Sequence, residues 1–156
     1  MKKQKEKDIE IIKDALKQYL QDHGFRNTPE RYTILEEIYK MDHHFNVDDL
    51  YLIMLNNKYH VSKATIYNSI EIFLDAGLIR KHQFSDKSST SASYEKSYFD
   101  KQHDHLVIYK KDGDKEIEEI VEFCDPRIQG IKDSIEEIFG VKIDSHSLYF
   151  YGHKNQ

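Results

Sequence analysis

The sequence predicts an α+β fold, in which a helical N-terminal domain is followed by a smaller α/β domain. Apolar residues recur at helical spacing through the first half of the chain, whereas later apolar runs are short and alternate with polar residues. Between the two patterns lies SDKSSTSAS, a polar stretch with the composition of a linker. We therefore expect a first domain at residues 1–84, a hinge at 85–92 and a second domain at 93–156.

The first domain contains four segments with helical periodicity. The first covers residues 5–22, and the second begins after Thr28 with a proline at its first position. Asn46, followed three residues later by an acid, begins the third. Ser62 begins the fourth, which stops at Gly77.

The rest of the chain predicts strands around a single helix. LIRKHQF and SASYEKSYF are short and β-like, and HDHLVIY and EIEEIVEF flank KKDGDK, which contains an Asp-Gly turn signal. Asp125 begins a helix with Pro126 at its first position, and VKIDSHSLYFYGH predicts a last strand. Three short helices followed by two strands is the order of a winged helix-turn-helix. Its third helix, here residues 62–75, enters the major groove of DNA.

The composition is ordinary for a cytoplasmic protein without a membrane partner. One cysteine cannot form an internal disulfide, and no apolar run approaches the roughly 20 residues needed to cross a bilayer. The basic start, MKKQKEKDIEIIK, lacks the apolar core of a signal peptide. Basic and acidic residues balance in residues 1–84, so the net charge of −5 arises in residues 85–156. A neutral domain beside an acidic one indicates a division of labour between them.

Two histidines, His103 and His105, stand two residues apart in a predicted strand. Residues at this spacing point to the same face of a strand. Two imidazoles on one face are half of a candidate metal site, although histidine is also a common half-buried polar residue. The pair alone leaves both interpretations open.

Six stretches of the chain, taken in order and spacing, resemble the ferric uptake regulator (Fur) family. They are GFRNTPERYTILEEI, HHFNVDDLY, VSKATIYNSIEIFLDAGLI, HDHLVIY, IVEFCDPRI and SHSLYFYGH. The resemblance implies a metal-dependent bacterial transcription regulator, not an enzyme. It implies a repressor of iron uptake and homeostasis whose winged-helix domain binds double-stranded operator DNA and whose α/β domain forms a homodimer.

The resemblance places the family's regulatory metal site on five positions of this sequence. They are His44, Glu95, His103, His105 and Glu122. Three imidazoles and two carboxylates form a shell that accepts Fe²⁺, Mn²⁺, Co²⁺ or Zn²⁺. We expect one divalent ion per subunit, with Fe²⁺ favoured in the cell and Zn²⁺ or Mn²⁺ bound in vitro. Since the helical half and the second half both supply ligands, bound metal would fix their relative orientation.

Two other metal sites of the family are altered here. The structural zinc site needs a Cys-x-x-Cys pair after the histidines, but Tyr109 and Asp112 stand there and the C-terminal tail has no thiol. We therefore expect folding without a thiolate zinc. Asp104 and His146 match half of another site and are a weak candidate for a second metal. The other two positions of that site hold Gln102 and Gln129.

The exposed face of the helix at 62–75, with an arginine of the TPER motif, supplies the expected DNA contacts. They are Arg31, Ser62, Lys63, Thr65, Tyr67 and Asn68. The family commonly has an arginine at the position of Asn68. Arginine pairs with guanine whereas asparagine prefers adenine, so the base preference stays open.

Several alternatives share parts of this pattern. A haem-, zinc-, manganese- or peroxide-responsive regulator of the same fold would use most of the same residues, and Cys124 is the one thiol available to haem. A metallohydrolase would need an open metal position and a base, for which no motif is present.

The remaining apolar residues and histidines predict core and surface. We expect His43, His82 and His153 at the surface. The expected core of the second domain consists of Val107, Ile117, Ile120, Phe123, Ile131, Ile135, Ile138, Leu148 and Phe150.

Overall fold

The structure is a computed structural model that describes residues 2–84, 92–99, 102–111, 113 and 115–155. It divides into two compact units. The first contains the described part of residues 1–83 and 91–100, and the second contains the described part of 84–90 and 101–156.

The predicted α+β class is confirmed. Of the predicted hinge only Ala92 is described, and Asp112 also lies outside the described residues. No helix within the described ranges is long and apolar enough to cross a membrane.

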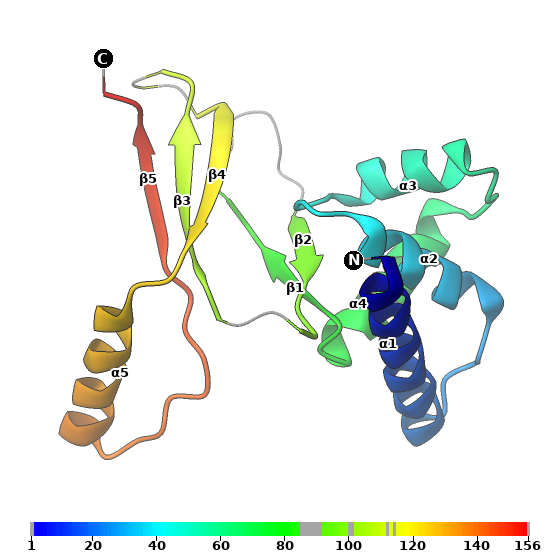
Figure 1. Cartoon of the computed structure of the whole chain (residues 1–156), viewed down its shortest axis with the longest axis horizontal. Helices are drawn as coiled ribbons and strands as arrows, with labels where there is room; N and C mark the ends of the chain where they lie inside the picture. Colours follow the sequence, from blue (N-terminus) through cyan, green and yellow to red (C-terminus); the bar gives the residue numbers. More distant parts are fainter. Residues whose placement is uncertain (1, 85–91, 100–101, 112, 114, 156) are drawn as a thin grey trace. The chain divides into compact units, whose positions relative to one another are not determined.

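The first unit contains α1 (Lys2–His23), α2 (Pro29–Lys40), α3 (Val47–Asn56) and α4 (Lys63–Asp75), shown in Figure 1. Polar caps begin the last two of them. Asn46 and Asp49 form a reciprocal capping box, and Ser62 Oγ accepts a hydrogen bond from Thr65 N at 3.1 Å. Gly77, in the left-handed region at φ 70°, follows the end of α4, where a side chain would be strained.

The apolar faces of the four helices meet in one hydrophobic core. Its fully buried members include Ile12, Leu16, Leu35, Leu50, Ile70 and Phe73. Burial of a side chain of this size contributes about 1.5–3 kcal/mol. Because α4 buries Ile66, Ile70 and Phe73 on one side, its polar side is held rigidly at the surface.

A small antiparallel sheet completes the first unit. It pairs β1 (Ile79–His82) with β2 (Ser93–Lys96) and places Arg80 opposite Glu95. A separate bridge joins Phe45 to Tyr94, which ties the segment before α3 to β2. Strand pairing with β1 groups β2 with the first unit, whereas the composition places the start of the second domain at residue 93.

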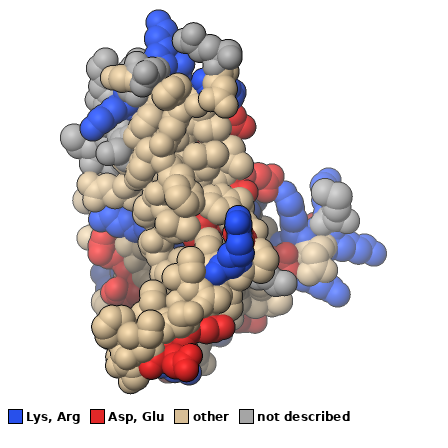
Figure 2. Space-filling view, turned by 90° about the vertical axis from the view of Figure 1, so that its left-hand side faces the viewer, with Lys and Arg blue, Asp and Glu red and all other residues tan. Residues whose placement is uncertain are grey.

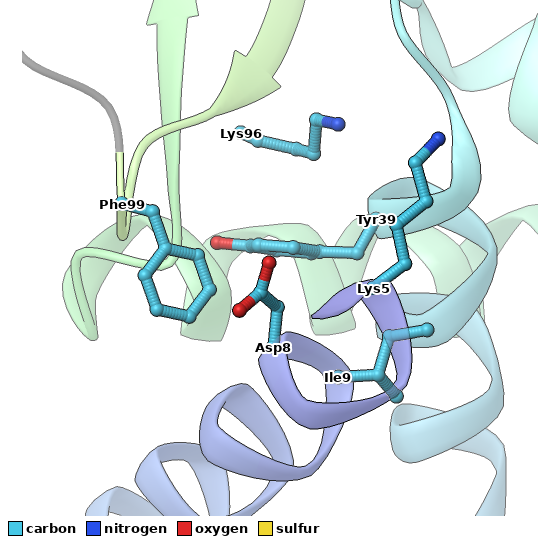
Figure 3. A pocket seen from close by; sticks show the side chains of 6 residues that line it. All are labelled: Lys5, Asp8, Ile9, Tyr39, Lys96 and Phe99. Carbon is cyan, nitrogen blue, oxygen red and sulfur yellow. The ribbon is translucent and has the colours of Figure 1, made fainter. Parts of the chain in front are cut away.

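The N-terminal helix α1 is attached beside a small cavity of the first unit, shown in Figure 3. The cavity is lined by Lys5, Asp8, Ile9, Tyr39, Lys96 and Phe99. The amino groups of Lys5 and Lys96 pair with Asp42 at 3.4 and 3.6 Å. The hydrogen bond from Lys5 is the main cause that lowers the pKa of the Asp42 carboxyl. Exposed pairs of this kind contribute at most about 1 kcal/mol, so the apolar core must supply most of the attachment of α1.

The second unit is a three-stranded sheet with one helix. β3 (Asp104–Tyr109) pairs antiparallel with β4 (Ile117–Phe123) on one side and parallel with β5 (Tyr149–His153) on the other. The helix α5 (Pro126–Phe139) lies in the connection from β4 to β5 (Figure 1). It begins where Asp125 accepts a hydrogen bond from Arg127 N at 2.9 Å, and it ends at Gly140, with φ 64°.

The apolar stripe of α5 is exposed. None of its residues is buried, and Ile131, Ile135 and Ile138 are 59%, 39% and 73% exposed. Phe150 of β5 is also exposed, whereas Val107 of β3 is fully buried as predicted. The prediction that the α5 stripe and Phe150 fill the core of a single chain is therefore wrong. Helical periodicity marks an apolar face without saying whether the same chain covers it.

Candidate metal centre and nucleic-acid interface

Three metal-ligand side chains converge within the first unit: His44, His82 and Glu95. His44 Nε2 lies 3.0 Å from one oxygen of the Glu95 carboxylate, and His82 Nε2 lies 2.6 Å from the other. The two imidazole rings meet edge to face, with 5.5 Å between their centroids. His82 and Glu95 are buried and His44 is nearly so. The three ligand atoms all lie within 4.8 Å of one another.

The strand register of the small sheet explains this convergence. Glu95 stands opposite Arg80, and His82, two residues further along β1, lies on the same face. The bridge between Phe45 and Tyr94 brings His44 to the same place from the segment before α3. The prediction that His82 lies at the surface is wrong, since it is only 6% exposed. The burial of His82 beside Glu95 could have been predicted only from the pairing of their two strands.

A second cluster forms within the second unit from His103, His105 and Glu122. The histidine rings have their centroids 4.8 Å apart, so the predicted pair does share one side of its strand. His103 Nε2 lies 3.7 Å from a Glu122 oxygen, and His105 stands directly opposite Glu122 in the register of β3 and β4. Phe84 and Tyr149 pack beside the fully buried ring of His105. The ligand atoms of this cluster also lie within 4.8 Å of one another.

The opposite face of β3 carries the residues of the weaker candidate site. Asp104 is 3% exposed, and its carboxylate lies 2.9 Å from His146 Nε2. Gln102 donates a hydrogen bond to the backbone carbonyl of His146 at 2.8 Å, while Gln129 donates to Asp133 on α5 at 2.7 Å. The structure thus brings Asp104 and His146 together, whereas the Gln129 side chain bonds within its own helix, α5. Cys124, the single thiol, is exposed and contacts the carbonyl of Gln102 at 3.4 Å.

The donor types in the two main clusters suit a first-row divalent ion. Each cluster combines two imidazoles with one carboxylate, and neither contains a thiolate. Such nitrogen and oxygen donors bind Fe²⁺, Mn²⁺, Co²⁺ and Zn²⁺. Burying a carboxylate such as that of Glu95 is costly unless cations or hydrogen bonds compensate it, and a divalent cation would do so.

Four of the six predicted DNA-contacting residues, Arg31, Ser62, Thr65 and Asn68, line one hollow at the start of α4. Arg26, Glu30 and His60, which the sequence pattern did not single out, line it as well. Tyr67 lies on the exposed side of α4, with 50% of its surface accessible. Lys63 pairs with Asp48 at 2.7 Å and its amino group lies over the ring of Tyr51. Ser62 is also the helix cap, so it holds α4 in addition to lining the hollow.

Comparisons with known proteins agree with the resemblance seen in the sequence. Residues 22–151 match the Ferric uptake regulator family. A ferric uptake regulation protein of Neisseria gonorrhoeae is 34% identical over 134 residues, which are 85% of this chain and 86% of that protein. The structure of the ferric uptake regulator of Pseudomonas aeruginosa with manganese has a TM-score of 0.71 at 25% identity, over 88% of this chain and 96% of that chain. The structure of the regulator of Francisella tularensis with iron has a TM-score of 0.67 at 28% identity, over 85% and 93%.

The winged-helix unit, the α/β unit and these likenesses define a metal-responsive transcription regulator and not an enzyme. The chain belongs to the ferric uptake regulator family.

Proposed function

We propose that this protein is an iron-responsive repressor of iron-uptake genes, acting as a cytoplasmic homodimer on operator DNA. The observation that carries this proposal is the pair of ligand clusters, because each unit presents imidazole and carboxylate donors of the type that binds Fe²⁺. The relatives named for ferric uptake regulation support iron as the signal. Manganese or zinc as the physiological ion is the alternative, since the same donors accept them.

In this proposal one ion per subunit is held by His44 and Glu95 of the first unit and by His103, His105 and Glu122 of the second. Ligands drawn from both units fix one relative orientation of the units. If DNA binds that orientation best, metal shifts the population toward it, and DNA tightens metal binding by the same factor. Couplings of this kind are typically about 1–3 kcal/mol, or about 5- to 150-fold in affinity.

Charge supports the same coupling. Glu95 and Glu122 supply two of the negative charges that give the protein its net charge of −5. A bound divalent cation neutralises them and reduces the repulsion of the DNA phosphates. Because the first domain is neutral overall, this change should matter more than it would in a strongly basic protein.

The polar side of α4 is the proposed recognition surface. Its packing through Ile66, Ile70 and Phe73 orients the half-buried Thr65 and the exposed Asn68 beside the hollow. In this proposal Asn68 reads a base edge, where an asparagine side chain prefers adenine. The arginines at the rim of the hollow, Arg26 and Arg31, are suited to phosphate contacts.

The exposed stripe of α5 supports a homodimer through the second unit. Phe139 and Val141 extend it, at 70% and 52% exposure. Figure 2, which turns toward the viewer the side drawn at the left of Figure 1, shows a face covered mainly by side chains other than Lys, Arg, Asp and Glu. A row of apolar side chains that their own chain leaves uncovered is a candidate subunit interface. A dimer would present two α4 helices to a two-fold-related operator.

A gel-shift experiment tests the proposal. The protein, freed of metal, is added to operator DNA alone and with Fe²⁺, Mn²⁺, Zn²⁺ or haem. We expect DNA binding to rise about 5- to 150-fold with Fe²⁺ and not with haem. His105→Ala and Glu95→Ala should abolish this response, while His23→Ala, which removes an exposed histidine of α1, should leave it intact. Equal DNA binding with and without metal would refute the switch.

A further inference from the structure

The cluster in the first unit contains one histidine more than the five-ligand set requires. His82 Nε2 lies 2.6 Å from Glu95, closer than His44 Nε2 at 3.0 Å, and each imidazole faces its own oxygen of the carboxylate. The side chain of His82 is 7% exposed. It comes from β1, whereas Glu95 comes from β2 and His44 from the segment before α3. Three separate segments therefore deliver their donor atoms to one buried point.

A purely structural role for His82 would be to neutralise Glu95 inside the small sheet. Two other residues of the same unit meet part of that need. Arg80 stands opposite Glu95 in the register, with its guanidinium 3.8 Å from the carboxylate, and His44 faces the second oxygen. His82 Nε2 makes the shortest of these contacts, a hydrogen bond of 2.6 Å to the carboxylate. A second imidazole at this point is also what a metal site needs, since two imidazoles and a carboxylate on one side of an ion form a common facial set.

We propose that His82 is a direct ligand of the regulatory metal, so that the DNA-binding unit supplies His44, His82 and Glu95. This inference rests on the proposed function, because it assigns a further ligand to the same ion. The ligand class is a first-row divalent cation such as Fe²⁺, Mn²⁺ or Co²⁺.

The number of donors has a consequence for function. With His82 the first unit offers three donors, two imidazoles and one carboxylate, which would occupy three positions around a divalent ion. The ion would then be held in the DNA-binding unit through two histidines instead of one.

Cobalt-substituted full-length protein provides the test. Each histidine bound to Co²⁺ through Nε2 gives one exchangeable, paramagnetically shifted Nδ1–H signal in the proton NMR spectrum. We expect four such signals in the unmodified protein, from His44, His82, His103 and His105. These side chains are all largely buried, which protects the signals from rapid exchange. His82→Ala and His82→Gln should each show three signals.

The glutamine variant separates a ligand from a positioning residue. Its amide can still donate a hydrogen bond to Glu95 but offers no imidazole to the ion. We expect Co²⁺ affinity, measured by calorimetry, to fall at least about tenfold in both variants, since losing even a residue that only orients a ligand typically costs about 10- to 100-fold. His23→Ala, the matched control, should keep four signals and full affinity. Circular dichroism shows whether each variant is folded, and His82→Gln carries the test if His82→Ala does not fold.

Two results would overturn the inference, and they are distinguishable. If the unmodified protein shows three signals that all persist in His82→Gln, His82 is not a ligand while the proposed function stands. If the unmodified protein binds no Co²⁺ at all, both this inference and the proposed metal switch fail.

Discussion

The exposed stripe of α5 gives a prediction whose size follows from the structure. Ile138 is 73% exposed in the single chain, and it lies one turn from Ile135 on the same side of the helix. If the stripe forms the subunit interface, replacing Ile138 by aspartate removes an apolar contact and places a negative charge in that interface. We expect Ile138→Asp to be folded but largely monomeric, because no residue of α5 is buried within its own chain.

The expected effect can be worked out from the exposed fraction. Full burial of an isoleucine side chain contributes about 1.5–3 kcal/mol, so covering the exposed part of Ile138 contributes about 1–2 kcal/mol. A two-fold interface contains the residue twice, which gives about 2–4 kcal/mol in total before the cost of burying a charge. Since about 1.4 kcal/mol corresponds to a tenfold change, the Kd of the dimer should rise about 30- to 700-fold.

Sedimentation equilibrium over a concentration series measures this Kd directly. Gln129→Asp is the matched control, because it adds the same residue to an exposed position on the opposite side of α5. The control should keep the dimer and the variant should lose it. An unchanged Kd for Ile138→Asp would refute the assignment of the α5 stripe to the subunit interface.

Three further predictions concern the core, the α5 cap and the metal. Ile70→Ala should lower the free energy of unfolding by about 2–5 kcal/mol, since Ile70 is fully buried beneath α4. Urea denaturation measures this, and a loss below about 1 kcal/mol would contradict the packing described. The hydrogen bonds from Arg127 lower the pKa of the Asp125 carboxyl from 3.8 to about 2, so the carboxylate stabilises the fold above pH 3.8 and this stabilisation is lost as the pH falls toward 2. NMR titration of Arg127→Ala should return that pKa toward 3.8, and a value still near 2 would exclude the Arg127 side chain as the main cause. Chelation by EDTA should abolish DNA binding but leave the circular dichroism spectrum of a folded protein, whereas unfolding would reveal a structural metal.

Local sequence signals predicted the helical half of the fold well. The apolar spacing and caps at Asn46 and Ser62 placed helix starts within a residue or two, because capping and periodicity act over only a few residues. The His103–His105 pair could be assigned to one strand face for the same reason. The boundary near residue 93 could not be read in this way, since β2 finds its partners, β1 and Phe45, far away in the chain.

The candidate site shows the same division. Residue types and their order, compared with a known family, pointed to His44, Glu95, His103, His105 and Glu122 as ligands. They did not point to His82, whose nearness to Glu95 depends on the register of two strands joined by a long connection. In the sequence, Gln102 and Gln129 occupy two ligand positions of the same family site. In the structure, Gln102 bonds to the backbone of His146 and Gln129 bonds to Asp133.

The sequence by itself predicted most of the helices and strands and five candidate donors for a metal, and it shows that no thiolate pair is present to hold zinc. These properties depend on side-chain chemistry and short-range spacing. The tertiary structure decided which donors share a cluster, that β2 belongs to the DNA-binding unit, and that the α5 stripe stays uncovered in one chain. Those outcomes depend on pairing between residues distant in the chain, and a local pattern carries no information about which distant partner it meets.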